Sequence, residues 1–83
     1  MADLSGTQYF QVKVDPELRV KQVLDIVYNA MTEKGYNPVN QIVGYIMSGD
    51  PTYITTHKNA RQLIQDIDRC ELLKKLIKNY LEI

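Results

Sequence analysis

The sequence predicts a mostly α-helical fold, namely a small bundle of four to five helices with one short N-terminal β-strand, assembled as a homodimer. Three observations support this prediction: apolar residues recur at helical spacing in several segments, proline and glycine fall where helices start and stop, and only one segment alternates as a strand does. The chain has 83 residues, of which 45% are hydrophobic and 24% charged, an ordinary composition for one small globular domain.

The N-terminal part of the chain divides into a tail and a strand. Residues 1–8 are small and polar apart from Leu4, and we expect a flexible tail there, ahead of a single helical domain over residues 9–83. Residues 9–14 alternate in character, because apolar side chains at every second position are separated by polar ones. This pattern predicts a short, half-buried strand whose apolar side carries Phe10, Val12 and Val14.

The first helix is predicted over about residues 16–34. Asp15 is a good N-cap, and Pro16 suits the first helical position because the amide hydrogen that proline lacks would have no helical acceptor there. Gly35 can adopt the left-handed conformation that ends a helix. The apolar residues between these signals recur at helical spacing and are Val20, Val23, Leu24, Val27 and Met31.

The second helix is predicted over about residues 38–47, because Asn37-Pro38 repeats the same start signal and Gly49 follows as a stop. The helix is apolar nearly all round, which is typical of a helix with no face in water. We therefore expect it to be the central, buried helix. The residues that suggest this are Val39, Ile42, Val43, Ile46 and Met47.

Two further helices are predicted in the C-terminal half. Residues 52–56 favour an extended segment or a single helical turn, and a polar helix is expected from about 58 to 67. Asp68 can cap the last helix, with Glu71 three residues later in the pattern of a capping box. In that helix we expect an inward-facing stripe formed by Leu72, Leu73, Leu76, Ile77, Tyr80 and Leu81.

The charge balance and the apolar segments exclude several classes of protein. Ten basic and ten acidic residues cancel, which argues against a nucleic-acid partner, because such proteins usually carry a positive excess. No apolar run approaches the roughly 18 residues of a membrane span, so no membrane insertion is expected. The first seven residues do not resemble a signal peptide, and we expect a cytoplasmic protein.

The single cysteine and the single histidine limit the chemistry of the chain. Cys70 has no intramolecular disulfide partner, and with His57 it supplies only two of the four ligands of a structural zinc site. The two residues lie thirteen positions apart, and the four glycines form no nucleotide-binding pattern. We therefore predict no metal, no cofactor and no enzymatic activity. Because an 83-residue chain has limited core volume, self-association is the reinforcement left open.

One long motif identifies a family. The stretch from Glu33 to Ile54 reads EKGYNPVNQIVGYIMSGDPTYI, and it resembles the signature of the IreB/ReoM family of small regulatory phosphoproteins. The similarity continues through the segment from His57 to Arg61 and, more loosely, to Leu81. About 50 residues match well, while the strand and the first helix are similar in pattern more than in identity.

The resemblance implies a regulatory function. Members of the family are small homodimeric helical proteins, in which a threonine of the N-terminal tail is phosphorylated by a membrane-anchored Ser/Thr kinase with PASTA repeats. The unphosphorylated protein restrains cell-wall synthesis. In the branch like ReoM it promotes degradation, by the ClpC–ClpP protease, of the enolpyruvyl transferase that begins peptidoglycan precursor synthesis. Phosphorylation relieves this restraint.

Carried over to this sequence, the resemblance implies that Thr7 is the phosphorylation site, with Ser5 as the neighbouring alternative. Thr7 stands just before Tyr9 and Phe10, as the tail threonine of the family stands before the first strand. A phosphate adds about −1.5 to −2 charge and three acceptor oxygens, so it can dock or release a tail. Without the resemblance, Thr7 would be an ordinary tail residue.

Two departures from the family pattern bear on the partners. Typical members have Pro-Arg where this chain has Thr55 and Thr56, and the last helix is richer in lysine here. Arg61 and Arg69 remain as candidate partner contacts, although either could be an ordinary solvated charge. An alternative function is DNA binding, because the helix at 38–47, the turn after it and a following short helix imitate a helix-turn-helix.

Overall fold

The computed structural model describes residues 16–83, and the predicted tail and strand lie outside the described residues. Within this part of the chain the fold is helical without strands, which confirms the prediction of a mostly α-helical protein. The elements comprise four α-helices and two short 3-10 turns. Their bounds are α1 Pro16–Glu33, α2 Pro38–Ser48, η2 Pro51–Tyr53, η3 His57–Asn59, α3 Ala60–Gln65 and α4 Arg69–Leu81.

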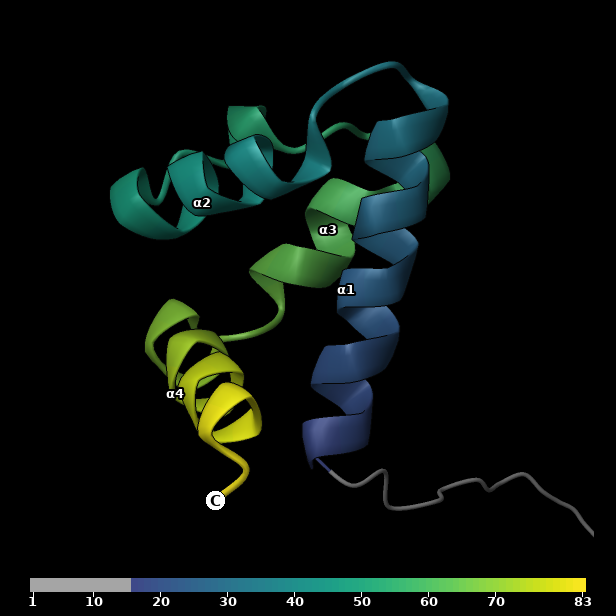
Figure 1. Cartoon of the computed structure of the whole chain (residues 1–83). Helices are drawn as coiled ribbons and strands as arrows, with labels where there is room; N and C mark the ends of the chain where they lie inside the picture. The colour runs from purple at the N-terminus through teal and green to yellow at the C-terminus, as the bar shows by residue number, and fades with distance from the viewer. Residues whose placement is uncertain (1–15) are drawn as a thin grey trace, which may run out of the picture.

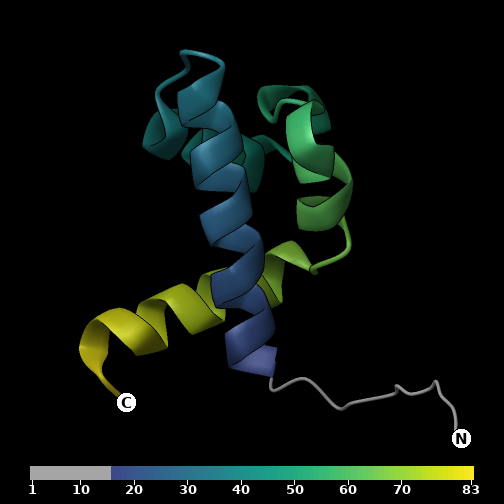
Figure 2. The ribbon, with the colours of Figure 1, turned by 90° about the vertical axis from the view of Figure 1, so that its right-hand side faces the viewer.

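The central element is α1, against which the other three helices pack (Figure 1). In Figure 1, α2 lies beside the C-terminal half of α1 and α4 lies beside its N-terminal half. The helix α3 lies between α2 and α4. The view turned by 90° shows α4 crossing close to the N-terminal end of α1 (Figure 2). Side chains of α1 supply nearly half of the buried core, namely Val20, Val23, Val27, Ala30 and Met31.

Local sequence signals set the helix ends as predicted. Gly35 adopts a φ of 83° after α1, and the next amide, that of Tyr36, donates to the carbonyl oxygen of Met31 at 2.9 Å. The Asn37 side chain accepts a hydrogen bond from the Asn40 amide at 3.1 Å at the start of α2. Gly49 ends α2 with a φ of 77°.

The prediction that the second helix is the buried, central one is wrong. Of the side chains of α2 only Tyr45 is buried, while Val39 and Val43 are 60% and 52% exposed. The physical reason is that α2 packs on α1 and η2 along one side only, so its remaining apolar positions have no element of the described chain over them. The presence of apolar residues on all sides of α2 therefore did not mean that all sides of the helix are buried.

The helix predicted over 58–67 is shorter in the structure and covers Ala60–Gln65. Lys58 and Asn59 have φ values of 54° and 63°, a left-handed conformation that cannot continue an α-helix. The segment before them forms the 3-10 turn η3 instead. The hydrophobic stripe of the prediction is retained, because Ala60 and Ile64 are fully buried and Ile67 remains 8% exposed after the helix ends.

The last helix starts as predicted, but most of its apolar stripe is exposed. The Asp68 carboxylate accepts a hydrogen bond from the Glu71 amide at 3.1 Å, which is the expected N-cap. Leu72 is fully buried and Leu76 is half-buried. In this single chain the other four members of the predicted inward stripe face outward, namely Leu73, Ile77, Tyr80 and Leu81. The prediction is wrong for them, because α4 lies at the margin of the fold and contacts mainly α1.

Candidate protein-interaction surface

The exposed apolar side chains of α2 and α4 form the most distinctive surface of the described chain. On each helix they are three or four residues apart, which places them in one row along the helix. We call them the α2–α4 surface, composed of Val39, Val43 and Met47 on α2 and of Leu73, Ile77 and Tyr80 on α4. Met47 is 79% exposed and Tyr80 is 90% exposed. Apolar patches of this kind on a small protein mark interaction sites.

A hollow of about 370 Å³ lies between the end of α2 and the start of α4, and of the six residues of the α2–α4 surface Leu73 lines it. Ile46 lines it from α2 and Leu73 lines it from α4, while Asp68, Arg69 and Cys70 complete the wall. The Cys70 thiol is free and exposed. An apolar floor with a charged rim can receive an apolar side chain of another molecule and orient a polar group beside it.

Arg69 fixes the two helices relative to each other at this hollow. The guanidinium donates a hydrogen bond to the carbonyl oxygen of Ile46 at 2.8 Å, near the end of α2. It also lies over Gly49, since a Cβ atom built on that glycine would come within 2.9 Å of the guanidinium carbon. Gly49 thus serves both the left-handed turn and the close approach of Arg69.

Arg61, the second arginine predicted to contact partners, has a different position. The side chain is half-buried, and Nε donates to the carbonyl oxygen of Ile54 at 2.8 Å. Arg61 therefore ties α3 to the segment after η2, whereas Arg69 ties α4 to α2. Thr7 and Ser5, the predicted phosphorylation sites, lie outside the described residues.

A polar cluster at the C-terminal end of α1 was not predicted. The Glu33 carboxylate contacts His57 Nε2 at 2.7 Å and Lys58 Nζ at 2.9 Å. The hydrogen bond with His57, followed by that with Lys58, lowers the pKa of Glu33 below the ordinary glutamate value. The cluster joins α1 to the segment in which Lys58 and Asn59 adopt left-handed conformations. Glu33, His57 and Lys58 all belong to the segments that resemble the family, but no local pattern in the sequence indicates that their side chains meet.

A second unpredicted contact closes the loop after α2. Gln41 Nε2 donates to the carbonyl oxygen of Tyr53 at 3.0 Å, so a polar side chain of α2 pairs with the backbone of η2. The Tyr53 ring lies over Gly44, where any added Cβ atom would clash with it. These contacts assign the family motif a structural role, namely to hold α2 and η2 together.

Comparison with known proteins decides the family. The sequence model described as "IreB regulatory phosphoprotein" matches residues 5–82 of the chain. The chain belongs to the IreB family. A protein of Lachnoclostridium phytofermentans, named only as a UPF0297 protein, is 62% identical over 82 residues, which cover 99% of this chain and 93% of that protein. A UPF0297 protein of Ruminiclostridium cellulolyticum is 51% identical over 79 residues, covering 95% and 90% of the two chains.

Membership of the IreB family confirms the resemblance seen in the motif and supports a regulatory role exercised through protein partners. The family description of a regulatory phosphoprotein points away from enzymatic activity. In the described residues, no helix is both long and apolar enough to cross a membrane.

Proposed function

We propose that this chain is a non-enzymatic, cytoplasmic regulatory adaptor of cell-wall synthesis that is switched by phosphorylation of its N-terminal tail. The observation that carries the proposal is the IreB family match, which begins at residue 5 and therefore includes the tail threonine. The exposed α2–α4 surface supports it, because an adaptor acts through contacts with other proteins.

Thr7 is the proposed phosphorylation site, with Ser5 as the alternative, and a membrane-anchored Ser/Thr kinase is the proposed enzyme. The test is to incubate the wild type, Thr7→Ala and Ser5→Ala with the kinase domain and to locate the phosphate by mass spectrometry. We expect phosphorylation to be lost in Thr7→Ala and retained in Ser5→Ala. Phosphorylation of Thr7→Ala to the level of the wild type would place the switch elsewhere.

The downstream partners are proposed to belong to the ClpC–ClpP protease machinery, which would act on a target of peptidoglycan precursor synthesis. Arg69 is the stronger candidate contact, because it is exposed at the rim of the hollow between α2 and α4. Arg61 is half-buried, so less of its side chain than of the Arg69 side chain is accessible to a partner. Capture of ClpC by purified wild type should weaken in Arg69→Ala more than in Arg61→Ala, with both variants checked for native circular dichroism.

A homodimer is the proposed assembly, with the α2–α4 surface at the interface. Ile77 and Leu18 offer a matched pair, since each is 51% exposed, but only Ile77 belongs to this surface. Ile77→Asp would bury a charge in the interface and should shift light scattering at micromolar concentration from about twice the monomer mass to the monomer mass. Leu18→Asp should remain dimeric, and a wild-type monomer throughout would refute this part of the proposal.

DNA binding is not favoured by the geometry. The element after α2 is η2, a three-residue 3-10 turn that is too short for a recognition helix. From Pro38 to His57 the sequence also has no lysine or arginine to contact phosphates. A gel shift with random DNA at physiological salt should show no complex.

A further inference from the structure

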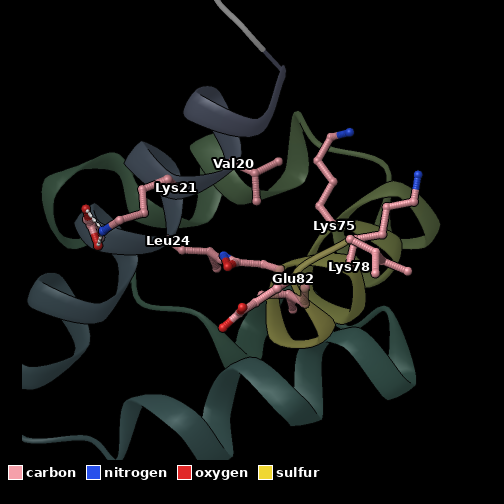
Figure 3. A pocket seen from close by; sticks show the side chains of 10 residues that line it. Val20, Lys21, Leu24, Lys75, Lys78 and Glu82 are labelled. Atoms are coloured by element: carbon pink, nitrogen blue, oxygen red, sulfur yellow. Dashed lines mark hydrogen bonds and ion pairs between the residues drawn. The ribbon is translucent and has the colours of Figure 1, made fainter.

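A second hollow, separate from the α2–α4 surface, lies between the N-terminal half of α1 and the C-terminal end of α4 (Figure 3). We call it the α1–α4 groove. Its volume is about 520 Å³, within the range of about 300–1,000 Å³ that is usual for binding pockets. The groove is therefore large enough to take up side chains of another molecule. Its apolar lining consists of Val20, Leu24, Leu76 and Ile83.

The apolar lining of the groove is only partly covered by the elements that the structure describes. Val20 is nearly buried, Leu24 and Leu76 are half-buried, and Ile83 is 85% exposed. The lining thus leads from the core of the fold to the solvent. Because the removal of apolar surface from water is favourable, a ligand that covers Leu24, Leu76 and Ile83 would gain binding free energy.

The charges at the rim of the groove favour a negatively charged ligand. On the α1 side, both carboxylate oxygens of Asp25 accept hydrogen bonds from Lys21 Nζ, at 3.0 and 2.8 Å, so these two charges offset each other. On the α4 side, neither Lys75 nor Lys78 takes part in the ion pairs that the described residues form with one another. Figure 3 shows both lysines extending to one side of the groove, whereas Glu82 extends toward the other. Two positive charges therefore lie together along one side of the groove.

Lys75 brings its charge close to the apolar lining. It is half-buried, whereas Lys74 and Lys78 on the same helix are exposed. A lysine in such a position lays its aliphatic stem along apolar surface and keeps its ammonium group in water. A ligand that enters the groove would thus contact apolar surface and a positive charge at neighbouring positions.

We propose that the α1–α4 groove binds an acidic segment of another protein, whose aliphatic or aromatic side chains enter the groove while its carboxylates pair with Lys75 and Lys78. An apolar centre with a charged rim is the usual arrangement of a protein interface, in which the rim charges select and steer the partner. A membrane surface fits less well, because a flat layer of anionic headgroups would reach the lysines without filling the hollow between the two helices.

This binding site goes beyond the regulatory role proposed above. It lies on one chain and uses neither Arg69 nor the α2–α4 surface. It also needs no kinase, so its failure in the experiments below would leave the proposed phosphorylation switch untouched.

The first experiment selects a ligand without assuming its sequence. Random peptides displayed on phage are depleted on the double variant Lys75→Glu/Lys78→Glu and are then selected on the wild-type protein. We expect the enriched peptides to combine Asp or Glu with at least one of Leu, Ile and Phe. Enriched peptides without acidic residues, or no enrichment on the wild type beyond the double variant, would overturn the proposal.

The second experiment measures the affinity of the most enriched peptide, with a fluorescent label, by anisotropy. Lys78→Glu should weaken binding by about fivefold or more, since it replaces an exposed ion pair by a repulsion. Lys74→Glu is the matched control, because Lys74 is exposed on the same helix but does not line the groove, and it should change the affinity by less than about twofold. Equal losses in the two variants would mean that the peptide responds to the charge of α4 as a whole, and the groove would not be its site.

The apolar lining is tested in the same way with two exposed residues at the C-terminal end of α4. Ile83 lines the groove and is 85% exposed, whereas Leu81 does not line it and is 59% exposed. Ile83→Asp should weaken binding of the peptide by about tenfold, because an apolar contact is lost and a like charge is added. Leu81→Asp should leave the affinity unchanged, and equal losses would refute the placement of the peptide in the groove.

The third experiment distinguishes a protein segment from a membrane surface. The wild type is mixed with vesicles of phosphatidylglycerol and phosphatidylcholine and centrifuged at physiological salt. We expect the protein to stay in the supernatant. Sedimentation with the vesicles that is lost in Lys78→Glu and kept in Lys74→Glu would assign the lysines to a lipid surface and overturn the proposal.

Discussion

The helices α1 and α4 carry similar apolar stripes, yet the fold covers them very differently. In α1, Val27, Ala30 and Met31 are completely buried, and Val20 and Val23 nearly so. In α4, Leu72 alone is completely buried, whereas Ile77 and Tyr80 are 51% and 90% exposed. The comparison teaches that helical periodicity identifies an apolar face without identifying what lies against that face.

The difference follows from the position of each helix in the fold. The helix α1 has neighbours along its whole length, because α2, α3 and α4 all pack against it. The helix α4 lies at the margin, so one side of it remains open. Burial of apolar surface is worth about 25 cal/mol per Å², so an open apolar side is a source of binding free energy. We expect substitutions in α1 to affect folding and those in the α2–α4 surface to affect association.

The largest expected effect contrasts Met31 with Met47, two methionines with 0% and 79% exposure. Met31→Ala leaves a cavity in the core and removes the sulfur that accepts a hydrogen bond from the Thr55 amide at 3.3 Å. We expect the free energy of unfolding to fall by about 2–5 kcal/mol. Met47→Ala should change it by less than about 0.5 kcal/mol at low protein concentration. Urea unfolding of both variants measures the contrast.

The two methionine variants also test association, because stability is measured at low protein concentration and self-association at micromolar concentration. Met47→Ala should weaken self-association, seen as a lower average mass by light scattering at micromolar concentration. Met31→Ala should not weaken it while the protein remains folded. Equal losses of unfolding free energy in the two variants would show that the distinction between a covered and an open side is wrong.

A smaller effect is expected from Gly35 and Gly49, which share a left-handed backbone but differ in their surroundings. Gly35→Ala meets no atom within 4 Å, so only the backbone cost of about 1 kcal/mol is expected. Gly49→Ala brings the same cost and also displaces the Arg69 guanidinium from the Ile46 carbonyl oxygen. We expect a loss of about 2 kcal/mol there, since a lost hydrogen bond adds about 1 kcal/mol.

The control for the glycine comparison is an Arg69→Ala background. With the guanidinium removed, Gly35→Ala and Gly49→Ala should reduce the free energy of unfolding by the same amount. A difference that persists without Arg69 would assign the larger cost at Gly49 to the turn itself. The junction between α2 and α4 would then not depend on this arginine.

The helix boundaries could be predicted because they depend on neighbouring residues. Asn37, Gly35 and Asp68 act within three or four positions of themselves, as caps and stops. The start of α3 could not be predicted, because the turn before it is joined by His57 and Lys58 to Glu33, more than twenty positions away. Burial was mispredicted for α2 and α4 for the same reason, since it depends on which helix occupies the centre.

The candidate interaction site was predictable in part. The charge of Arg61 and Arg69 suggested contacts with partners. In the structure the Arg61 side chain donates a hydrogen bond to the Ile54 carbonyl oxygen, and the Arg69 side chain donates one to the Ile46 carbonyl oxygen. No local sequence pattern predicts such contacts within the fold. The apolar residues of the α2–α4 surface were recognised in the sequence and interpreted as core. The spacing of apolar residues in a sequence shows which face of a helix is apolar. It does not show whether that face packs against the same chain or binds another molecule.

The smallest expected effect compares two surface ion pairs, one in each of the contrasted helices. Glu33 of α1 binds His57 and Lys58 from a distant segment, whereas Glu71 of α4 contacts Lys74 one turn away at 3.7 Å.

The pKa of Glu33 is lowered in the folded state, so its contribution to stability is present above its ordinary pKa. That contribution is lost as the pH falls through the lowered value. Glu33→Gln should therefore reduce the thermal midpoint at neutral pH, and its difference from the wild type should shrink as the pH falls below the ordinary glutamate pKa of 4.5. Glu71→Gln, which breaks only a local contact, should give a smaller difference at neutral pH. A pH-independent gap between Glu33→Gln and the wild type would show that the carboxylate charge does not stabilise the turn before α3.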